Sequence, residues 1–130
     1  MVEKRMAPGK KDVPYDLRER TFLFSVRAIK WVRTLPHDLG TQIAAKQFLE
    51  ATTSVGANVE EADGAGTPKD RVYKWTLARK EARESRYWVR VLCAAGADSA
   101  ECRALEQEGA ELINILSALI NKGKSSLDAS

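Results

Sequence analysis

The side chains best suited to binding chemistry in this sequence are arginines that recur every three or four residues. Steps of four, three and four place their guanidinium groups along one side of a helix. This arginine ridge consists of Arg79, Arg83, Arg86 and Arg90, and Arg71 and Lys74 add positive charge near it. Planar guanidinium groups match the geometry of phosphate oxygens. The pattern predicts contact with RNA, DNA or another polyanion, mostly electrostatic and steeply dependent on salt.

The distribution of charge along the chain allows a second interpretation. Residues 16–35 carry five basic and two acidic side chains, and residues 36–66 carry one and five. Residues 67–95 carry eight and three, and residues 96–130 carry three and six. If these segments are neighbouring helices, opposite charges meet in the folded protein, and Arg83 or Arg86 pairs with glutamates of the second or fourth helix. Both interpretations stay open at this point.

Residues for catalysis or metal binding are sparse. The only histidine, His37, directly follows Pro36, so it cannot supply the Glu-x-x-His pairs of a di-iron bundle. The Gly64–Gly66 segment lacks the Gly-Lys-Ser/Thr that completes a phosphate-binding loop. Glu81 and Glu84 form a carboxylate pair, but such pairs on a charged helix are usually solvated or ion-paired. The sequence predicts a protein that is not an enzyme and has no metal site or cofactor.

Cysteine usage and hydropathy indicate where the protein works. Cys93 and Cys102 do not form a Cys-x-x-Cys motif, and each falls on an expected helix, so we expect two buried free thiols. No segment approaches the ~18 consecutive apolar residues of a membrane span. Met1–Pro14 is basic and has no apolar signal-peptide core. We therefore expect a cytoplasmic protein with no membrane partner.

Four helical segments must position these side chains. The first is expected to start at Asp16, an N-cap with Glu19 three residues on, and to stop at Pro36. Thr67 and Pro68 give the third segment its start signal. Counted from the expected start of each helix to the residue before its expected end, the four helices span about 16–35, 41–62, 67–95 and 99–122. Glycines are expected to end the last two, at Gly96 and Gly123, and Gly56 inside the second indicates a close backbone approach or a kink.

Each segment carries a heptad seam of mostly apolar residues, which is typical of packed helices. The seams run from Leu17 to Leu35, Ala44 to Ala62, Trp75 to Leu92 and Cys102 to Leu119. Short loops between helices favour antiparallel neighbours. The predicted fold is an all-α, antiparallel up-down-up-down four-helix bundle over residues 15–122. Residues 1–14 are expected to form a disordered basic arm, and residues 123–130 a flexible tail.

Two of the helices also carry apolar residues on the side opposite the seam. In the first helix these are Phe22, Val26 and Ile29, and in the third they are Tyr73, Leu77, Trp88 and Val91. A contiguous exposed stripe of this kind is typical of a subunit interface, so we expect self-association. The alternative is a wider core that covers these positions.

Two polar residues lie among apolar ones. Glu84 lies in the second stripe of the third helix and requires a cationic partner, either Lys80 or an arginine of a neighbouring subunit. Asn58 lies on the seam of the second helix, where hydrogen bonds inside the core would fix the register of the helices. We expect a structural role for both.

Three runs of residues resemble a known family. They are Gln47-Phe48-Leu49, the run from Ser54 to Ala62 and the run from Lys80 to Arg90. They resemble the bacterial four-helix bundle proteins named for intervening sequences in 23S ribosomal RNA genes, and the similarity extends from Tyr15 to Asn121. That family is similar in fold to the accessory variability protein of diversity-generating retroelements, whose wider group forms ring-like pentamers linked to nucleic acid and to a reverse transcriptase.

The resemblance implies a homopentamer, contact with RNA or DNA, and no catalytic residues. It also implies a structural or interface polar network, made of Asn58, Glu61, Lys80, Glu81, Glu84 and Arg86. Two departures weaken the expected grip on nucleic acid: Glu50 replaces an expected basic residue, and the basic tail is reduced to Lys122 and Lys124. The leading hypothesis is a homopentameric scaffold whose basic surface contacts nucleic acid or a protein that handles it. The alternative is a protein–protein adaptor in which charge serves assembly alone.

Overall fold

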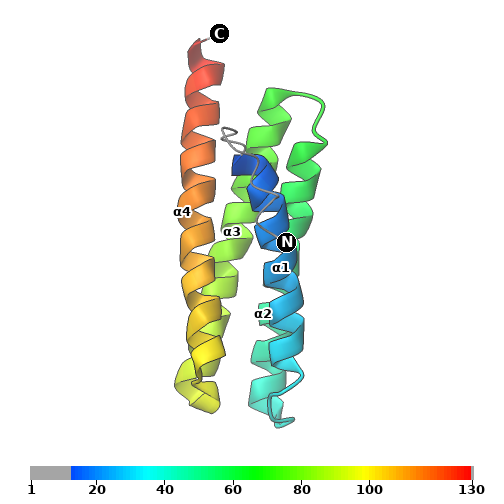
Figure 1. Ribbon diagram of the computed structural model, residues 1–130, viewed down its shortest axis with the longest axis vertical. Coiled ribbons are helices and arrows are strands. Elements are labelled where there is room, and N and C mark those ends of the chain that lie inside the picture. The colour runs from blue at the N-terminus through cyan, green and yellow to red at the C-terminus, as the bar shows by residue number, and fades with distance from the viewer. Residues whose placement is uncertain (1–12, 130) are drawn as a thin grey trace.

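The computed structural model describes residues 13–129, and in this part of the chain every regular element is helical. The helices are α1 (Val13–Val32), α2 (Leu39–Asp63), α3 (Pro68–Leu92) and α4 (Ala100–Ala129), with a short π-helical turn, η2 (Cys93–Ala97), between α3 and α4. The chain reverses direction at each connection, so successive helices run in opposite directions (Figure 1). The expected all-α four-helix bundle is confirmed. The predicted arm lies, except for its last two residues, outside the described part.

Each helix packs on its neighbour in sequence, and α1 also contacts α4, which closes the bundle. The α2–α3 and α3–α4 contacts are the most extensive, and the α1–α4 contact is the least. The heptad seams form the core, as predicted. Trp31 of α1 meets Phe48 of α2 edge-to-face, with ring centroids 5.7 Å apart, and both belong to one buried cluster that includes Leu105 of α4 and Val89 of α3.

Capping side chains set the starts of three helices. The amides of Thr41 and Asp70 donate to the side chains of Asp38 and Thr67, each at 3.0 Å. The amide of Cys102 donates to the Ser99 hydroxyl in the same way, at 3.1 Å. Such bonds satisfy amides that have no partner within the first turn of a helix. The expected cap at Thr67 and the expected start of the last helix near Ser99 are confirmed, whereas α2 begins two residues earlier than predicted because Asp38 caps it.

The predicted ends of α1 were wrong. The helix begins at Val13, so Asp16 lies inside it and is not its cap. At the other end α1 stops at Val32, and a tighter turn follows in which the amides of Thr34 and Leu35 donate to the carbonyls three residues back. Leu35 is still buried, because this turn brings it back to the core.

Gly123 does not end the last helix, contrary to the prediction, since α4 continues to Ala129. A Cβ atom at Gly123 would lie 2.6 Å from Cγ2 of Val72 and 3.7 Å from the ring of Trp75. The glycine is therefore a point of close packing between α4 and the start of α3. Gly96, in contrast, interrupts the helical backbone as expected, although it lies inside η2 and α3 itself ends at Leu92; its φ of +132° is one that glycine adopts at no steric cost.

The two cysteines are joined in a disulfide, so the expectation of free thiols was wrong. Cys93 begins the η2 turn, and Cys102 lies in the first turns of α4 with its side chain fully buried. The reversal at Gly96 brings their Cα atoms to 6.2 Å, well within the range for a disulfide. The bond ties the α3–α4 connection together at one end of the bundle.

Asn58 does not provide the expected polar contact in the core. Its side chain is half-buried and donates to the carbonyl of Ser54 in its own helix, at 2.9 Å. Val59 takes the core position beside it and is 2% exposed. The buried polar link between helices is instead a 2.7 Å hydrogen bond between the hydroxyls of Thr52 in α2 and Ser85 in α3. This bond constrains the register of the two helices, which is the role expected of Asn58.

Gly56 gives a test of the contact between α1 and α2. A Cβ there would lie 3.3 Å from the backbone oxygen of Thr21, whereas a Cβ at Gly40, also in α2, would meet nothing closer than 3.8 Å. Alanine favours a helix over glycine at both sites, by up to ~1 kcal/mol. We expect Gly56→Ala to be less stable than Gly40→Ala by about 0.5–1 kcal/mol in urea unfolding, because the close approach cancels the helix-propensity gain. Equal stability of the two variants would contradict the close approach.

Candidate interaction surfaces on α1 and α3

Most of the arginine ridge borders the α3–α4 interface. Arg79 donates to the hydroxyl of Ser117, with 3.2 Å between nitrogen and oxygen. Arg86 and Arg90 both face the carboxylate of Glu106, at 3.5 and 3.8 Å. Arg83 is exposed and makes no ion pair among the described residues. Among the described residues, only two of the four guanidinium groups face a carboxylate, and they share it, so the ridge keeps a positive charge.

The two remaining cations predicted to bind nucleic acid lie nearer the start of α3. Arg71 is half-buried and lines a shallow cleft with Arg18 and Trp75. The Lys74 ammonium lies 5.9 Å from the centre of the Tyr73 ring, within range of a cation–π interaction. Neither forms an ion pair within the described chain, so both add to the positive charge of α3.

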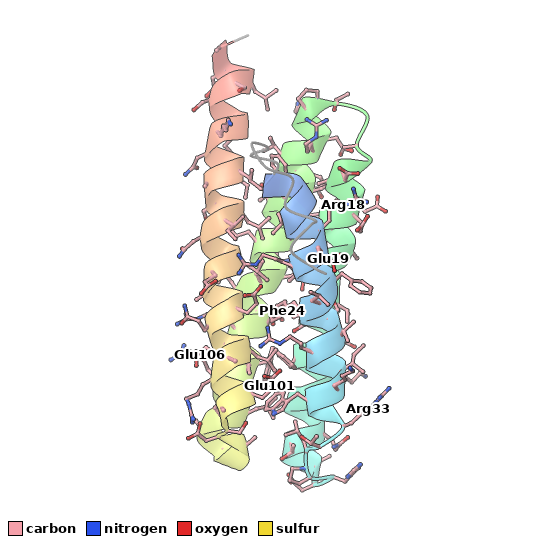
Figure 2. All side chains as sticks on the ribbon, in the orientation of Figure 1. Arg18, Glu19, Phe24, Arg33, Glu101 and Glu106 are labelled. Atoms are coloured by element: carbon pink, nitrogen blue, oxygen red, sulfur yellow. A yellow bond between two sulfur atoms is a disulfide. The ribbon has the colours of Figure 1, made fainter. Side chains whose placement is uncertain are left out.

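Basic residues of α1 are engaged by acidic residues of its two neighbours. Arg20 grips Glu108 of α4 with two nitrogens, at 2.7 and 3.0 Å, and also reaches Glu111 at 2.9 Å. These bonds, chiefly the one to Glu108, raise the pKa of Arg20 further above its usual range. Figure 2 shows Glu101 between α4 and α1, where it pairs with Arg27 at 3.3 Å.

The contact between α1 and α2 also includes ion pairs. Arg18 pairs with Asp63 at 3.2 Å and lies 3.5 Å from Glu60. Basic α1 is thus linked by ion pairs to acidic helices on both sides, as the second interpretation of the charge pattern predicted. For α3 that interpretation holds for Arg86 and Arg90, but not for Arg83.

The acidic pair on α3 is divided between two environments. Glu81 is half-buried, and its pKa is raised, first by loss of solvent and then by the charge of Glu84, which Lys80 partly offsets. Glu84 itself is exposed, and among the described residues it has no ion pair, either with Lys80 or with an arginine. An interface partner for Glu84 therefore stays a prediction.

The polar network implied by the family resemblance is not formed within one chain. No hydrogen bond or ion pair joins Asn58, Glu61, Lys80 and Glu81 to one another in the described part, and Lys80 interacts with Glu81 only through its charge. Glu61 and Lys80 are exposed. A role for these residues between subunits stays a prediction.

The two apolar faces differ in how far the single chain covers them. On α1, Phe22 is 59% and Ile29 39% exposed, and Val26 is half-buried. On α3, Tyr73 is 56% exposed, whereas Leu77, Trp88 and Val91 are half-buried. Trp88 and Val91 pack against the core, so the wider-core alternative holds for these two side chains.

Sequence reasoning missed several exposed apolar residues. Leu23 extends the α1 face, and Leu39 and Ile43 lie near the start of α2. Tyr87, on α3, is 54% exposed beside Trp88. Tyr87 lies one helical turn from both Arg83 and Arg90. This spacing would have placed it on the same side of the helix as the arginine ridge.

Residues 13–129 show neither a metal-binding cluster nor a membrane-spanning helix. They contain no group of three or more histidine, cysteine, aspartate or glutamate side chains arranged to hold a metal ion. None of their helices is long and apolar enough to cross a membrane. The described surface is that of a charged helical bundle with two partly uncovered apolar faces.

The fold and its charged surface define the class as an all-α four-helix bundle protein without a recognisable catalytic centre in the described residues. Residues 15–118 match the family model for 23S rRNA-intervening sequence proteins, and the chain belongs to this family. The resemblance seen in the sequence is thereby confirmed.

Among solved structures, the chain is similar to a protein of unknown function from the S23 ribosomal protein family of Bacteroides thetaiotaomicron. The two are 27% identical, with a TM-score of 0.76, over 83% of this chain and 97% of that one. No curated protein is similar enough to count as a match. The comparisons support the fold and the family, and they assign no activity.

The contrast between two carboxylates gives a test of these electrostatics. Burial and Glu84 raise the pKa of Glu81 above 4.5, so its ionisation opposes folding as the pH rises past that value. Gln107 and Arg20 lower the pKa of Glu111 below 4.5, so its ionisation favours folding, and that stability is lost as the pH falls. We expect Glu81→Gln to be more stable than wild type at pH 7, and Glu111→Gln to be less stable.

Urea unfolding at a series of pH values measures both differences. Each should shrink as the pH falls through the pKa of the carboxyl concerned in the folded protein, because the wild-type side chain is then also neutral. Differences of the same sign, or differences that do not change with pH, would contradict the assigned environments.

Proposed function

We propose that this protein is a non-enzymatic, homo-oligomeric binding protein, a pentamer by analogy with the group its sequence resembles. Its basic surface contacts RNA, DNA or a protein that handles nucleic acid. The observation that carries the proposal is the outward side of α3, where a cationic ridge lies beside a partly uncovered apolar face.

Self-association is supported by the exposed apolar side chains of α1 and α3. Exposed apolar residues scattered singly need no explanation, but Phe22, Leu23, Val26 and Ile29 lie on one side of a single helix. α1 and α3 do not pack closely on each other, so the two faces are separate surfaces of the bundle. Two different faces that meet between copies make head-to-tail contacts, which form a ring when the rotation between copies closes.

Contact with nucleic acid is supported by the imbalance of charge on α3. Glu106 faces both Arg86 and Arg90, whose side chains keep 41% and 58% of their exposure. Arg83 and Lys80 are exposed with no ion pair in the described chain. Repetition of this ridge around an oligomer would multiply its field and attract a polyanion.

A second candidate, a protein–protein adaptor, is favoured by one specific observation. The α1 arginines form ion pairs with neighbouring helices of the same chain, at Arg18, Arg20 and Arg27. On α1 the alternation of charge between helices therefore serves packing. If the same held for α3 in the assembled protein, no cationic surface would remain for nucleic acid.

Light scattering of the purified protein tests self-association. We expect a mass of several times 14.4 kDa, and a shift towards monomer for the variant Phe22→Glu, Ile29→Glu, because charge opposes the burial of this face. Both side chains are exposed in the single chain, so the helix content should not change. Leu39→Glu, at a 76% exposed site outside the predicted interface, serves as the control and should keep the mass. A monomeric wild type would refute the oligomer.

A salt titration of binding to generic RNA and duplex DNA tests the cationic surface. Changing Arg79, Arg83 and Arg90 together to Ala should abolish binding and leave the oligomer intact. The control is Lys30→Ala, Arg33→Ala, Lys46→Ala, which removes the same charge from exposed sites on and after α1 and on α2. In Figure 2, Arg33 points away from the bundle. If wild type binds neither ligand even at low salt, the adaptor is the better description.

A further inference from the structure

A stripe of residues along one side of α3, spaced one helical turn apart, combines cations with an exposed aromatic ring. Lys80, Arg83, Tyr87 and Arg90 follow one another in steps of three, four and three, which places them along one side of the helix. All four are exposed. The sequence patterns assigned the arginines to phosphate binding and Lys80 to a polar network, and they left Tyr87 without a role.

The Tyr87 ring is held in position although more than half of it is exposed. It meets the indole of Trp88 edge-to-face, with 4.9 Å between the ring centres and 79° between the planes. Trp88 in turn packs against the core of the bundle. The exposed surface of Tyr87 is therefore available without ordering a mobile side chain, which lowers the entropic cost of binding.

Along the stripe, the groups on either side of the ring are positively charged, and the exposed carboxylate of Glu84 lies beside the stripe, one turn before Tyr87. Arg83 has no ion pair among the described residues, and Arg90 has only the 3.8 Å contact with Glu106. The two arginines are seven residues apart, about 10 Å along the helix, and Tyr87 lies between them. An aromatic platform with a cation on each side suits a chain of alternating flat rings and negative charges.

We propose that this stripe binds single-stranded nucleic acid, with an unpaired base stacked on Tyr87 and the neighbouring phosphates on Arg83 and Arg90. The proposal rests on the nucleic-acid contact proposed above, and it specifies the class of ligand. Base faces are accessible in a single strand and are covered by neighbouring pairs inside a duplex, so stacking on a protein ring selects the single strand.

Fluorescence anisotropy with a labelled single-stranded RNA of mixed sequence, and with the duplex of the same sequence, tests the stripe. Tyr87→Leu should weaken binding of the single strand roughly 5- to 100-fold, as expected for loss of one stacked base, and leave the duplex affinity within about twofold. Tyr87→Phe should bind like wild type, because the ring is kept. Single-stranded DNA of the same sequence shows whether the 2′-hydroxyl contributes.

The dependence of affinity on salt separates stacking from charge. Tyr87→Leu should leave the slope of log affinity against log salt unchanged, whereas Arg83→Ala should reduce its magnitude by about one. Leu39→Ala removes an exposed apolar side chain from α2, outside both the stripe and the proposed interface, and should change neither affinity nor slope. Circular dichroism and light scattering check that every variant keeps the fold and mass of wild type.

Equal losses for single strand and duplex in Tyr87→Leu, or no loss for either, would overturn the stacking role and leave the general nucleic-acid contact standing. If wild type binds neither form at low salt, the nucleic-acid contact and the stripe fail together. A normal single-strand affinity in Tyr87→Leu with a reduced salt slope in Arg83→Ala would assign binding to charge alone.

Discussion

Arg20 reaches across from α1 to two glutamates of α4, and Arg18 and Arg27 make comparable contacts with α2 and α4. The ion pairs of Arg20 and Arg27 lie between α1 and α4, where α1 has its least extensive packing, so charge adds to a thin apolar contact there. Exposed pairs contribute little individually, but the two-nitrogen grip of Arg20 on Glu108 is partly buried and geometrically specific. This pairing of oppositely charged neighbours decides which arginines are left for other partners.

On α3 only some of the arginines are paired with carboxylates of a neighbouring helix. Glu106 is the one carboxylate of α4 that meets the ridge, and it faces Arg86 and Arg90 together. Arg83 projects beyond its reach, beside Tyr87 and Lys80. The difference between α1 and α3 is thus one of charge balance. The helix whose arginines are matched is tied into the bundle, and the helix with surplus arginines offers a surface for binding.

The ends of the bundle are defined by small residues and by local bonds. Gly123 lets α4 run alongside the start of α3, and Gly56 lets α2 approach Thr21 of α1. At the opposite end from Gly123, the Cys93–Cys102 disulfide closes the α3–α4 connection around Gly96. These contacts constrain the relative heights of α1 and α2 and of α3 and α4.

The periodicity of the sequence was sufficient to predict the helices, the heptad core and the fold, because local spacing decides which side of a helix is apolar. It also placed the arginine ridge and both apolar faces. Tertiary structure alone decided what each face meets: Cys93 reaches Cys102, Gly123 packs on Val72, and Ser85, not Asn58, makes the buried polar link. These outcomes depend on the distances between residues of different helices, which no pattern within one helix contains.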